Sequence, residues 1–327
     1  MQPFSYERFD DPSAAVDQVS WQPHAKFIGG GTNLLDFMKL NVELPTRLID
    51  INPLPLTKIE ITGTGVRIGA MVRNSDLAWD ETIRSRYPVL SQALLSGATP
   101  QVRNMATVGG NLLQRTRCSY FRDTVWECNK RRPGSGCAAL QGYNRSHAIL
   151  GTSEKCIATH PSDMCVALTA LGAVIETQGP RDKRQIPITE FFVAYGDEPA
   201  RENMLEHGEL VTAVFLPDKP LFTKSHYLKV RDRASFEFAL ASVAAALEIK
   251  DGKIAWARLA LGGIATKPWR ATNAENTLAG ARPERAAYVA AAEIALNGAV
   301  PQKFNAFKIE LAKRVIVRAL VTVADMV

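Results

Sequence analysis

The sequence predicts an α+β protein of two or three domains, and three features lead to that expectation. The chain has 327 residues, more than one small hydrophobic core usually organises. Short strands alternate with helices over the first fifty residues. The last hundred residues instead show the alternation of an antiparallel sheet, followed by helical segments. We place the domain boundaries at 1–55, 56–220 and 221–327.

The N-terminal unit, residues 1–55, is expected to be a small βαβ arrangement. A glycine-rich turn joins a compact apolar strand to a helix, and Pro53 and Pro55 mark the end of the unit. Apolar spacing predicts strands at Phe4–Arg8, Ala25–Ile28 and Arg47–Ile51, and helices at Pro12–Val19, with Asp11 as a cap, and at Asn33–Leu40.

The second unit, residues 56–220, is predicted to begin with a hairpin whose turn is Gly63-Thr64-Gly65. Asn74 or Ser75 can cap a helix. Between 114 and 156 the apolar residues follow neither the spacing of a helix nor the alternation of a strand for long, so we expect one long cysteine-containing loop. The other expected elements are strands at Lys58–Thr62, Val66–Met71, Ala173–Thr177 and Glu209–Leu216, and helices at Pro88–Ser96 and from Ser162 or Asp163 to Leu171.

The third unit, residues 221–327, is predicted to contain a three-stranded antiparallel sheet with helices. Asp251-Gly252 is a typical hairpin turn between two of its strands. The strands are expected at Ser225–Arg231, Phe238–Ile249 and Ile254–Gly262, and the helices at about Pro283–Ala295 and Phe304–Val323.

Composition excludes several classes of function. The net charge is +6, but the basic residues are dispersed outside one stretch from Arg115 to Arg132, and aromatic residues are not interleaved with them. We therefore expect no nucleic-acid partner. No run approaches the ~18 apolar residues of a membrane span, so no membrane insertion is expected. The first residues lack the apolar core of a secretion signal, which leaves a cytoplasmic location or periplasmic co-export with a partner.

Two glycine-rich segments, Ile28–Leu35 and Ala106–Leu112, can each bind a phosphate group. Glycines between a strand and a helix let backbone N–H groups converge on an anion. The first segment is not a dinucleotide fingerprint, since Leu34 stands where the third glycine would be, and no Lys-Ser/Thr pair of a Walker A loop follows it. A triple-glycine turn is often only structural, but two similar loops can hold both phosphates of one dinucleotide.

The five cysteines suggest a metal site rather than a disulfide framework, because their number is odd and the chain is large. A loop of about forty residues is seldom ordered unless an additional interaction fixes its conformation. Coordination of a metal by several side chains can provide that interaction. The spacing has no close zinc-type pair and no ferredoxin run, so the metal stays unnamed and reduced free thiols remain an alternative. Cys165 lies in an apolar helical segment and is expected to be a core thiol. The candidate ligands are Cys118, Cys128, Cys137 and Cys156.

Four segments in order carry a family resemblance: Lys26–Leu35 (KFIGGGTNLL), Gln101–Leu112 (QVRNMATVGGNL), His160–Asp163 (HPSD) and Tyr227–Ser242 (YLKVRDRASFEFALAS). Together they resemble the FAD-binding medium subunits of the molybdenum hydroxylases, the xanthine dehydrogenase family. The resemblance covers nearly the whole chain and is strongest to the bacterial aldehyde oxidoreductase type. It implies a two-subdomain FAD-binding fold of the vanillyl-alcohol-oxidase/PCMH type plus a C-terminal α+β domain.

The resemblance also implies which residues contact FAD. The second loop would complete the grip on the diphosphate, and Asp163 would lie on the ribityl or ribose side. Leu210 and Val211 would lie against the isoalloxazine, and Lys229 near the same ring, while the role of Arg103 stays open. The expected FAD contacts outside these positions are Lys26, Phe27, Ile28, Gly29, Gly30, Gly31, Thr32, Asn33, Leu34, Ala106, Thr107, Gly110 and Asn111.

The same resemblance names the metal group and the partners. Related subunits with a cysteine-bearing loop at this place bind a [4Fe–4S] cluster, as a relay or as a structural element. The chain would receive electrons from a [2Fe–2S] small subunit, which takes them from a molybdenum-cofactor large subunit. FAD would then pass them to a soluble acceptor or oxygen. We expect no general acid–base residue. The rival hypotheses are a stand-alone FAD-dependent reductase or oxidase and a zinc-stapled module without redox function.

Overall fold

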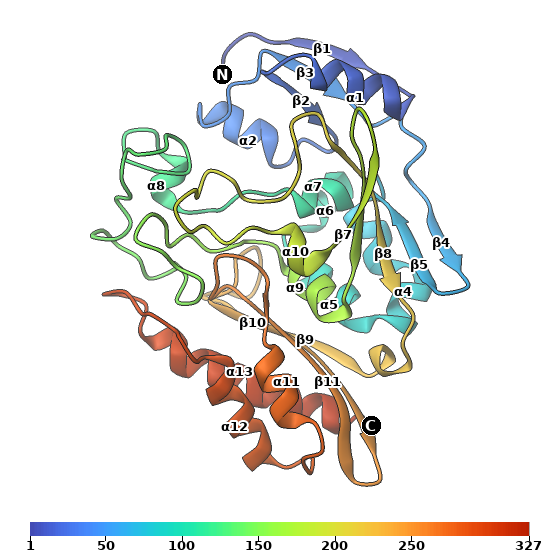
Figure 1. Cartoon of the computed structure of the whole chain (residues 1–327), viewed down its shortest axis with the longest axis vertical. Coiled ribbons are helices and arrows are strands. Elements are labelled where there is room, and N and C mark those ends of the chain that lie inside the picture. The colour runs from blue at the N-terminus through green and yellow to red at the C-terminus, as the bar shows by residue number, and fades with distance from the viewer. Residues whose placement is uncertain (327) are drawn as a thin grey trace.

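The computed structural model describes residues 1–326, which form three sheets, each with its own helices. Figure 1 shows the three sheets following one another along the long axis of the molecule, in the order of the sequence. Among the described residues, no helix combines the length and apolar character that crossing a bilayer requires.

The N-terminal sheet confirms the predicted βαβ unit. Its strands run parallel in the order β1-β3-β2. Helix α1 (Pro12–Ser20) begins where predicted, since Asp11 accepts a hydrogen bond from the Ala14 backbone N–H at 2.8 Å, and its apolar face packs on the sheet. The other elements are β1 (Ser5–Arg8), β2 (Ala25–Ile28), α2 (Leu34–Lys39) and β3 (Arg47–Asp50).

The central sheet has five antiparallel strands in the order β4-β5-β8-β6-β7. The predicted hairpin is confirmed as β4 and β5. Strand β7 was not predicted, because its sequence KRQIP is largely polar, as suits an edge strand with exposed side chains. The strands are β4 (Ile59–Thr62), β5 (Gly65–Gly69), β6 (Val174–Gln178), β7 (Lys183–Pro187) and β8 (Leu210–Pro217).

Helix α9 (Asp163–Leu171) is the buried centre of this region. The helix starts at Asp163, one of the two predicted positions, and Ser162 caps it by accepting a hydrogen bond from the Cys165 N–H at 3.0 Å. The predicted cap at Asn74 or Ser75 is wrong, because the helix already includes Asn74 and Arg73 precedes it. The remaining helices are α3 (Asn74–Trp79), α4 (Glu81–Arg86), α5 (Pro88–Ser96), α6 (Pro100–Met105), α7 (Val108–Leu112), α8 (Ser119–Arg122) and α10 (Ile188–Phe191).

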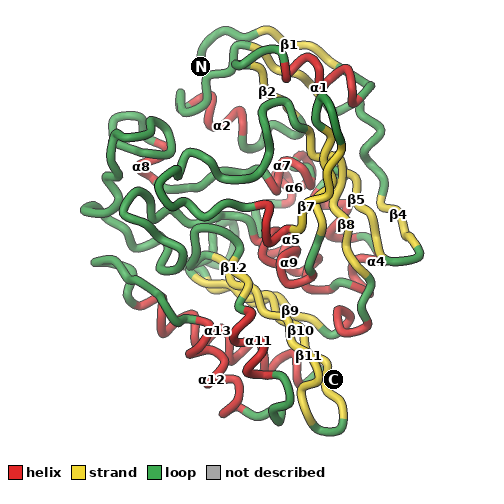
Figure 2. Tube along the Cα trace, viewed as in Figure 1, coloured by secondary structure: helices red, strands yellow, loops and turns green. Residues whose placement is uncertain are grey.

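The predicted long loop is confirmed. Between 114 and 156 the structure has only the single turn α8 and three isolated bridges, which pair Cys128 with Cys137, Leu150 with Ala265 and Ser153 with Cys156. Figure 2 shows this segment as the largest region without regular structure, lying between the N-terminal and C-terminal units.

The C-terminal sheet is antiparallel as predicted, but it has four strands in the order β12-β11-β10-β9 rather than three. The added edge strand contains only two residues, too few for a periodic pattern. Asp251 and Gly252 both adopt positive φ at the predicted hairpin turn. The elements are η1 (Pro220–Thr223), β9 (Ser225–Val230), β10 (Ala241–Lys250), β11 (Lys253–Gly262), β12 (Trp269–Arg270), α11 (Thr272–Leu278), α12 (Arg285–Ala295) and α13 (Phe307–Ala324).

Candidate cofactor site

The two glycine-rich segments meet in direct backbone contact. A Cβ atom on Gly30 would lie 1.9 Å from the Met105 carbonyl oxygen, and one on Gly29 would lie 3.3 Å from the Thr107 hydroxyl. Glycine at position 30 is therefore required for the close approach of the loops. The second loop is fixed in turn, because the Gly109 N–H donates to the Ala70 carbonyl at 2.8 Å.

The polar side chains of Asn33 and Thr107 lie beside this contact and line a cavity. Thr107 caps α7, its hydroxyl accepting from the Gly110 N–H at 3.1 Å. The side-chain oxygen Oδ1 of Asn33 accepts a hydrogen bond from the backbone N–H of Arg115 at 3.1 Å. The Nδ2 of the same side chain is buried without a hydrogen-bond partner. A buried donor without a partner costs free energy, so Asn33 is suited to a ligand with acceptor oxygens.

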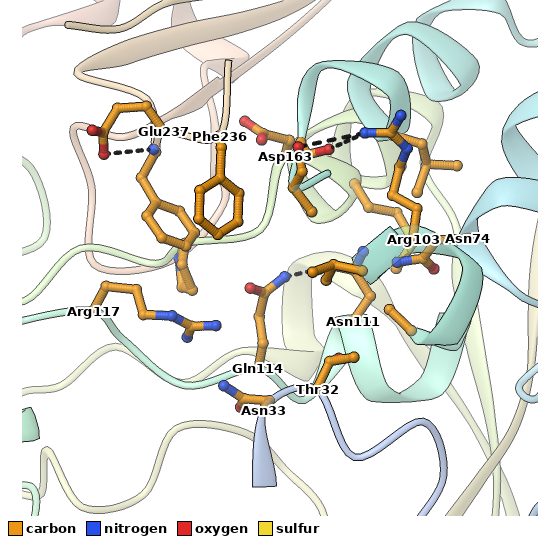
Figure 3. A pocket seen from close by; sticks show the side chains of 18 of the residues that line it. Thr32, Asn33, Asn74, Arg103, Asn111, Gln114, Arg117, Asp163, Phe236 and Glu237 are labelled. Carbon is orange, nitrogen blue, oxygen red and sulfur yellow. Dashed lines mark hydrogen bonds between the residues drawn. The ribbon is translucent and has the colours of Figure 1, made fainter. Parts of the chain in front are cut away.

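Two cavities open on either side of the glycine loops, of about 610 Å³ and about 300 Å³. Thr32, Asn33 and Gly110 line both, so the loops form the wall between them. In Figure 3 Thr32 and Asn33 lie at the floor of the larger cavity, with Asp163 and Phe236 across from them. A ligand longer than either cavity can therefore pass over the loops with one end in each.

The larger cavity has a buried polar centre at Asp163. Its carboxylate accepts from the Lys229 ammonium at 2.7 Å and from the Tyr227 hydroxyl at 2.6 Å. The preceding residue, Ser162, donates to the Asn111 side chain at 2.7 Å and so joins this centre to the second glycine loop. Burial, followed by the charge of Asp163, raises the pKa of Tyr227 well above its ordinary value, so the hydroxyl stays a donor.

The smaller cavity is mainly apolar. Phe27, Met71, Leu210 and Val211 line it, the last two from the start of β8. Among the polar groups in its wall, Lys26 is paired with Glu43. A flat apolar ring system suits such a cavity better than a charged group.

The structure brings every predicted FAD residue into the wall of one cavity or the other. Leu210 and Val211 line the smaller cavity only, whereas Lys229 lines the larger one only. That all three residues lie at the isoalloxazine stays a prediction.

Several lining residues of the larger cavity were missed by sequence reasoning: Asn74, Gln114, Arg117, Phe236 and Glu237. Phe236 and Glu237 lie in the segment Tyr227–Ser242, which carries the family resemblance but named no contact at these positions. Figure 3 shows the Arg117 guanidinium directed into the cavity. Burial lowers the pKa of Arg117 to about 10. Arg103, whose role was open, donates to the Gly97 carbonyl at 2.6 Å, which indicates that it holds the loop after α5.

The four candidate metal-binding cysteines belong to neighbouring parts of the long loop. Cys118 packs against two small hydrophobic clusters, one containing Cys128 and the other Cys156, and Cys128 is the bridge partner of Cys137. Cys165 is apart from them, in the core around α9. Within residues 1–326, no three His, Cys, Asp or Glu side chains are spaced as ligands of one metal ion, and all five thiols are free. Burial raises the pKa of Cys118 and of Cys156 to about 12.

A third, smaller cavity of about 160 Å³ adjoins the larger cofactor cavity. Its lining includes Cys118 and His147 together with Asp163 and Phe238, which also line the larger cavity. The cysteine cluster and the larger cavity are thus neighbours through space, although Cys118 and Asp163 are far apart in the sequence.

A buried ionic network fixes the long loop to the first glycine loop. Arg115 pairs with Glu43 and with Glu202, and Lys130 pairs with Glu202 at 2.8 Å. Arg122 likewise pairs with a carboxylate outside the loop, that of Asp36 in α2, at 2.7 Å. The order of the loop and the position of Asn33, which Arg115 also contacts, depend on the same charges.

The chain matches two family models. Residues 2–219 match the FAD binding domain in molybdopterin dehydrogenase, and residues 226–323 match the CO dehydrogenase flavoprotein C-terminal domain.

Known proteins agree with these two matches. The aldehyde oxidoreductase FAD-binding subunit PaoB of Escherichia coli K12 is 53% identical over 322 residues, which cover 98% of each chain. The glyceraldehyde dehydrogenase medium chain of Sulfolobus acidocaldarius is 30% identical over 85% of this chain and 81% of its own length. A solved structure of carbon monoxide dehydrogenase from Hydrogenophaga pseudoflava, which lacks the Mo-pyranopterin moiety, aligns with a TM-score of 0.78, 26% identity and coverage of 99% and 98%.

Proposed function

The chain belongs to the FAD-binding subunits of the molybdenum hydroxylase family, and we propose that it is the electron-transfer flavoprotein of a molybdenum-containing aldehyde oxidoreductase. The observation that carries this proposal is the contact between the two glycine loops, with a cavity on each side. A dinucleotide laid over the contact places its diphosphate against backbone N–H groups and one ring system in each cavity.

The chemistry of the two cavities supports one direction for the dinucleotide. The apolar cavity at Phe27, Leu210 and Val211 suits the adenine, which needs little charge compensation. The larger cavity holds the Lys229 ammonium and the Asp163 carboxylate, so it suits the isoalloxazine. FAD bound there supplies one- and two-electron redox chemistry, and the buried cation of Lys229 favours negative charge on the ring. Asn33 and Thr107 would position the diphosphate between the two ends.

The thiols of Cys118, Cys128, Cys137 and Cys156 are suited to a [4Fe–4S] cluster. Four thiolates are the usual ligand set for such a cluster, and these four residues gather on one loop. Burial raises the pKa of the Cys156 thiol to about 12, and the ammonium of Lys130 only partly opposes this rise, so the thiolate that binds iron would form as the metal displaces the proton. We assign Cys165 to the hydrophobic core instead.

The partners we propose follow from the family. The molybdenum-cofactor large subunit would oxidise an aldehyde, and the [2Fe–2S] small subunit would carry the electrons to this chain. A soluble acceptor or oxygen would receive them from the flavin. In favour of the aldehyde as substrate is the relative PaoB, named as an aldehyde oxidoreductase subunit and similar over 98% of the chain.

The test is to purify the chain with its partner subunits, record the visible spectrum and quantify FAD, iron and zinc in each subunit. We expect about one FAD per chain and, in this subunit, four irons. Absence of flavin contradicts the proposed function. A chain that purifies alone and turns over a substrate indicates a stand-alone flavoenzyme, and zinc without flavin indicates a structural module.

A further inference from the structure

His147 is directed at the sulfur of one candidate cluster ligand. Its Nε2 lies 3.1 Å from the Cys118 Sγ, within hydrogen-bond reach of a sulfur acceptor. The imidazole is buried, with 3% of the residue exposed, and its Nδ1 contacts no hydrogen-bond partner. Among the described residues, the only hydrogen-bond partner of the two ring nitrogens is therefore the sulfur atom of Cys118.

The C-terminal domain holds His147 in that position. The backbone carbonyl of His147 accepts from the Lys308 ammonium at 3.0 Å and from the Asn305 amide at 3.2 Å. Lys308 is itself fully buried and also donates to the carbonyls of Ser146 at 2.9 Å and Gly263 at 2.7 Å. A buried ammonium that uses its donors on three carbonyls leaves the segment carrying His147 little freedom to move.

We propose that His147 is a positioning residue that donates a hydrogen bond from Nε2 to the Cys118 sulfur and raises the reduction potential of the centre bound there. This inference rests on the cluster assignment of the proposed function. A donor to a thiolate sulfur stabilises the reduced centre more than the oxidised one, because the reduced centre carries more negative charge. Cys118 also lines a cavity together with Asp163 of the proposed flavin site.

Two substitutions separate the hydrogen bond from the packing of the ring. His147→Leu fills similar space without a donor, whereas His147→Gln keeps an N–H donor at a similar distance along the side chain. His226→Leu is the matched control, because it removes another partly buried imidazole, on β9 of the C-terminal sheet.

The measurement is an EPR-monitored redox titration of the complex purified with its partner subunits. The signal of a reduced four-iron centre is separated from the two-iron signals by its faster relaxation. We expect His147→Leu to shift the one-electron reduction equilibrium about tenfold toward the oxidised form, a fall of ~59 mV. His147→Gln should stay near the wild-type potential, and His226→Leu should not change it.

Each other outcome overturns the inference. Equal potentials in wild type and His147→Leu show that the hydrogen bond does not act on the centre. Loss of iron from both His147 variants, with FAD retained, indicates a ligand or structural role instead. Wild-type complex with FAD but without iron in this subunit removes the basis of the inference and leaves the flavin function standing, whereas wild type without FAD contradicts the proposed function itself.

Discussion

At the scale of single residues, Gly30 offers a sharp test of the diphosphate site. In Gly30→Ala the new methyl group would collide with the Met105 carbonyl, so the two loops must separate. Overpacking of this kind costs about 1–3 kcal/mol, which, if lost from the binding free energy, corresponds to a fall in FAD affinity of about 5- to 150-fold. FAD retained after gel filtration measures this loss.

Gly63→Ala is the control for Gly30→Ala. Gly63 is in the β4–β5 turn, and a Cβ atom there meets nothing within 4 Å. It should keep the wild-type FAD content. If Gly30→Ala keeps it as well, the contact between the loops is not the site of the diphosphate.

Sequence predicted single residues well where a motif reflects a requirement on the backbone. The glycine segments could be recognised because only glycine allows the two loops to approach so closely. Prediction was weaker for side chains brought from a distance: Arg117 and Asn74 line the larger cavity, but no cofactor-binding motif in the sequence includes them. The separation of Leu210 from Lys229 could not be deduced from sequence either, since it depends on which side of the loops each strand lies.

At the scale of elements, the long loop provides a test of the metal ligands. Cys137→Ser should remove the iron of this subunit, because a hydroxyl is a poor replacement for a thiolate ligand. Cys165→Ser should retain the iron, because Cys165 is part of the core around α9. Iron and acid-labile sulfide analysis of each variant measures the result. Iron lost from the Cys165 variant but kept in the Cys137 variant would show that the ligand set is wrong.

Regular elements were predictable where side chains alternate between core and solvent. Strand β2 and helix α5 have the predicted ends, because a buried face imposes a period on the sequence. The polar edge strand β7 and the two-residue strand β12 lack such a face. Their positions are set by backbone hydrogen bonds to neighbouring strands, and such bonds do not require a particular amino-acid composition.

At the scale of the whole molecule, the buried ionic network predicts sensitivity to acid. Burial alone would raise the pKa of Glu202, but Arg115 and Lys130 outweigh it and hold that pKa below the ordinary 4.5. A carboxylate with a lowered pKa contributes stability that is fully present above its unfolded pKa and is lost as the pH falls through the folded one. We therefore expect the thermal midpoint to fall below about pH 4.5.

Glu202→Gln should weaken this dependence and destabilise the protein, since it leaves Arg115 and Lys130 incompletely paired. Breaking a buried pair typically costs about 3–5 kcal/mol. Glu248→Gln is the control, because Glu248 pairs with the exposed Lys250. Thermal unfolding of the three proteins between pH 3 and 7, a range that spans the ordinary carboxylate pKa values, provides the comparison. Identical pH profiles for wild type and Glu202→Gln would show that the network does not control acid stability.

The sequence by itself determined the chemistry that each segment carries: two glycine loops that admit a phosphate, four cysteines on a loop without regular structure, and sheets whose buried faces repeat every second residue. These are local properties, and the backbone and side chains of one segment suffice to express them. Only the tertiary structure decided that the glycine loops form a wall between two cavities and that His147 reaches the sulfur of Cys118. Those relations join residues distant in the sequence, and they depend on packing between domains, which no local pattern records.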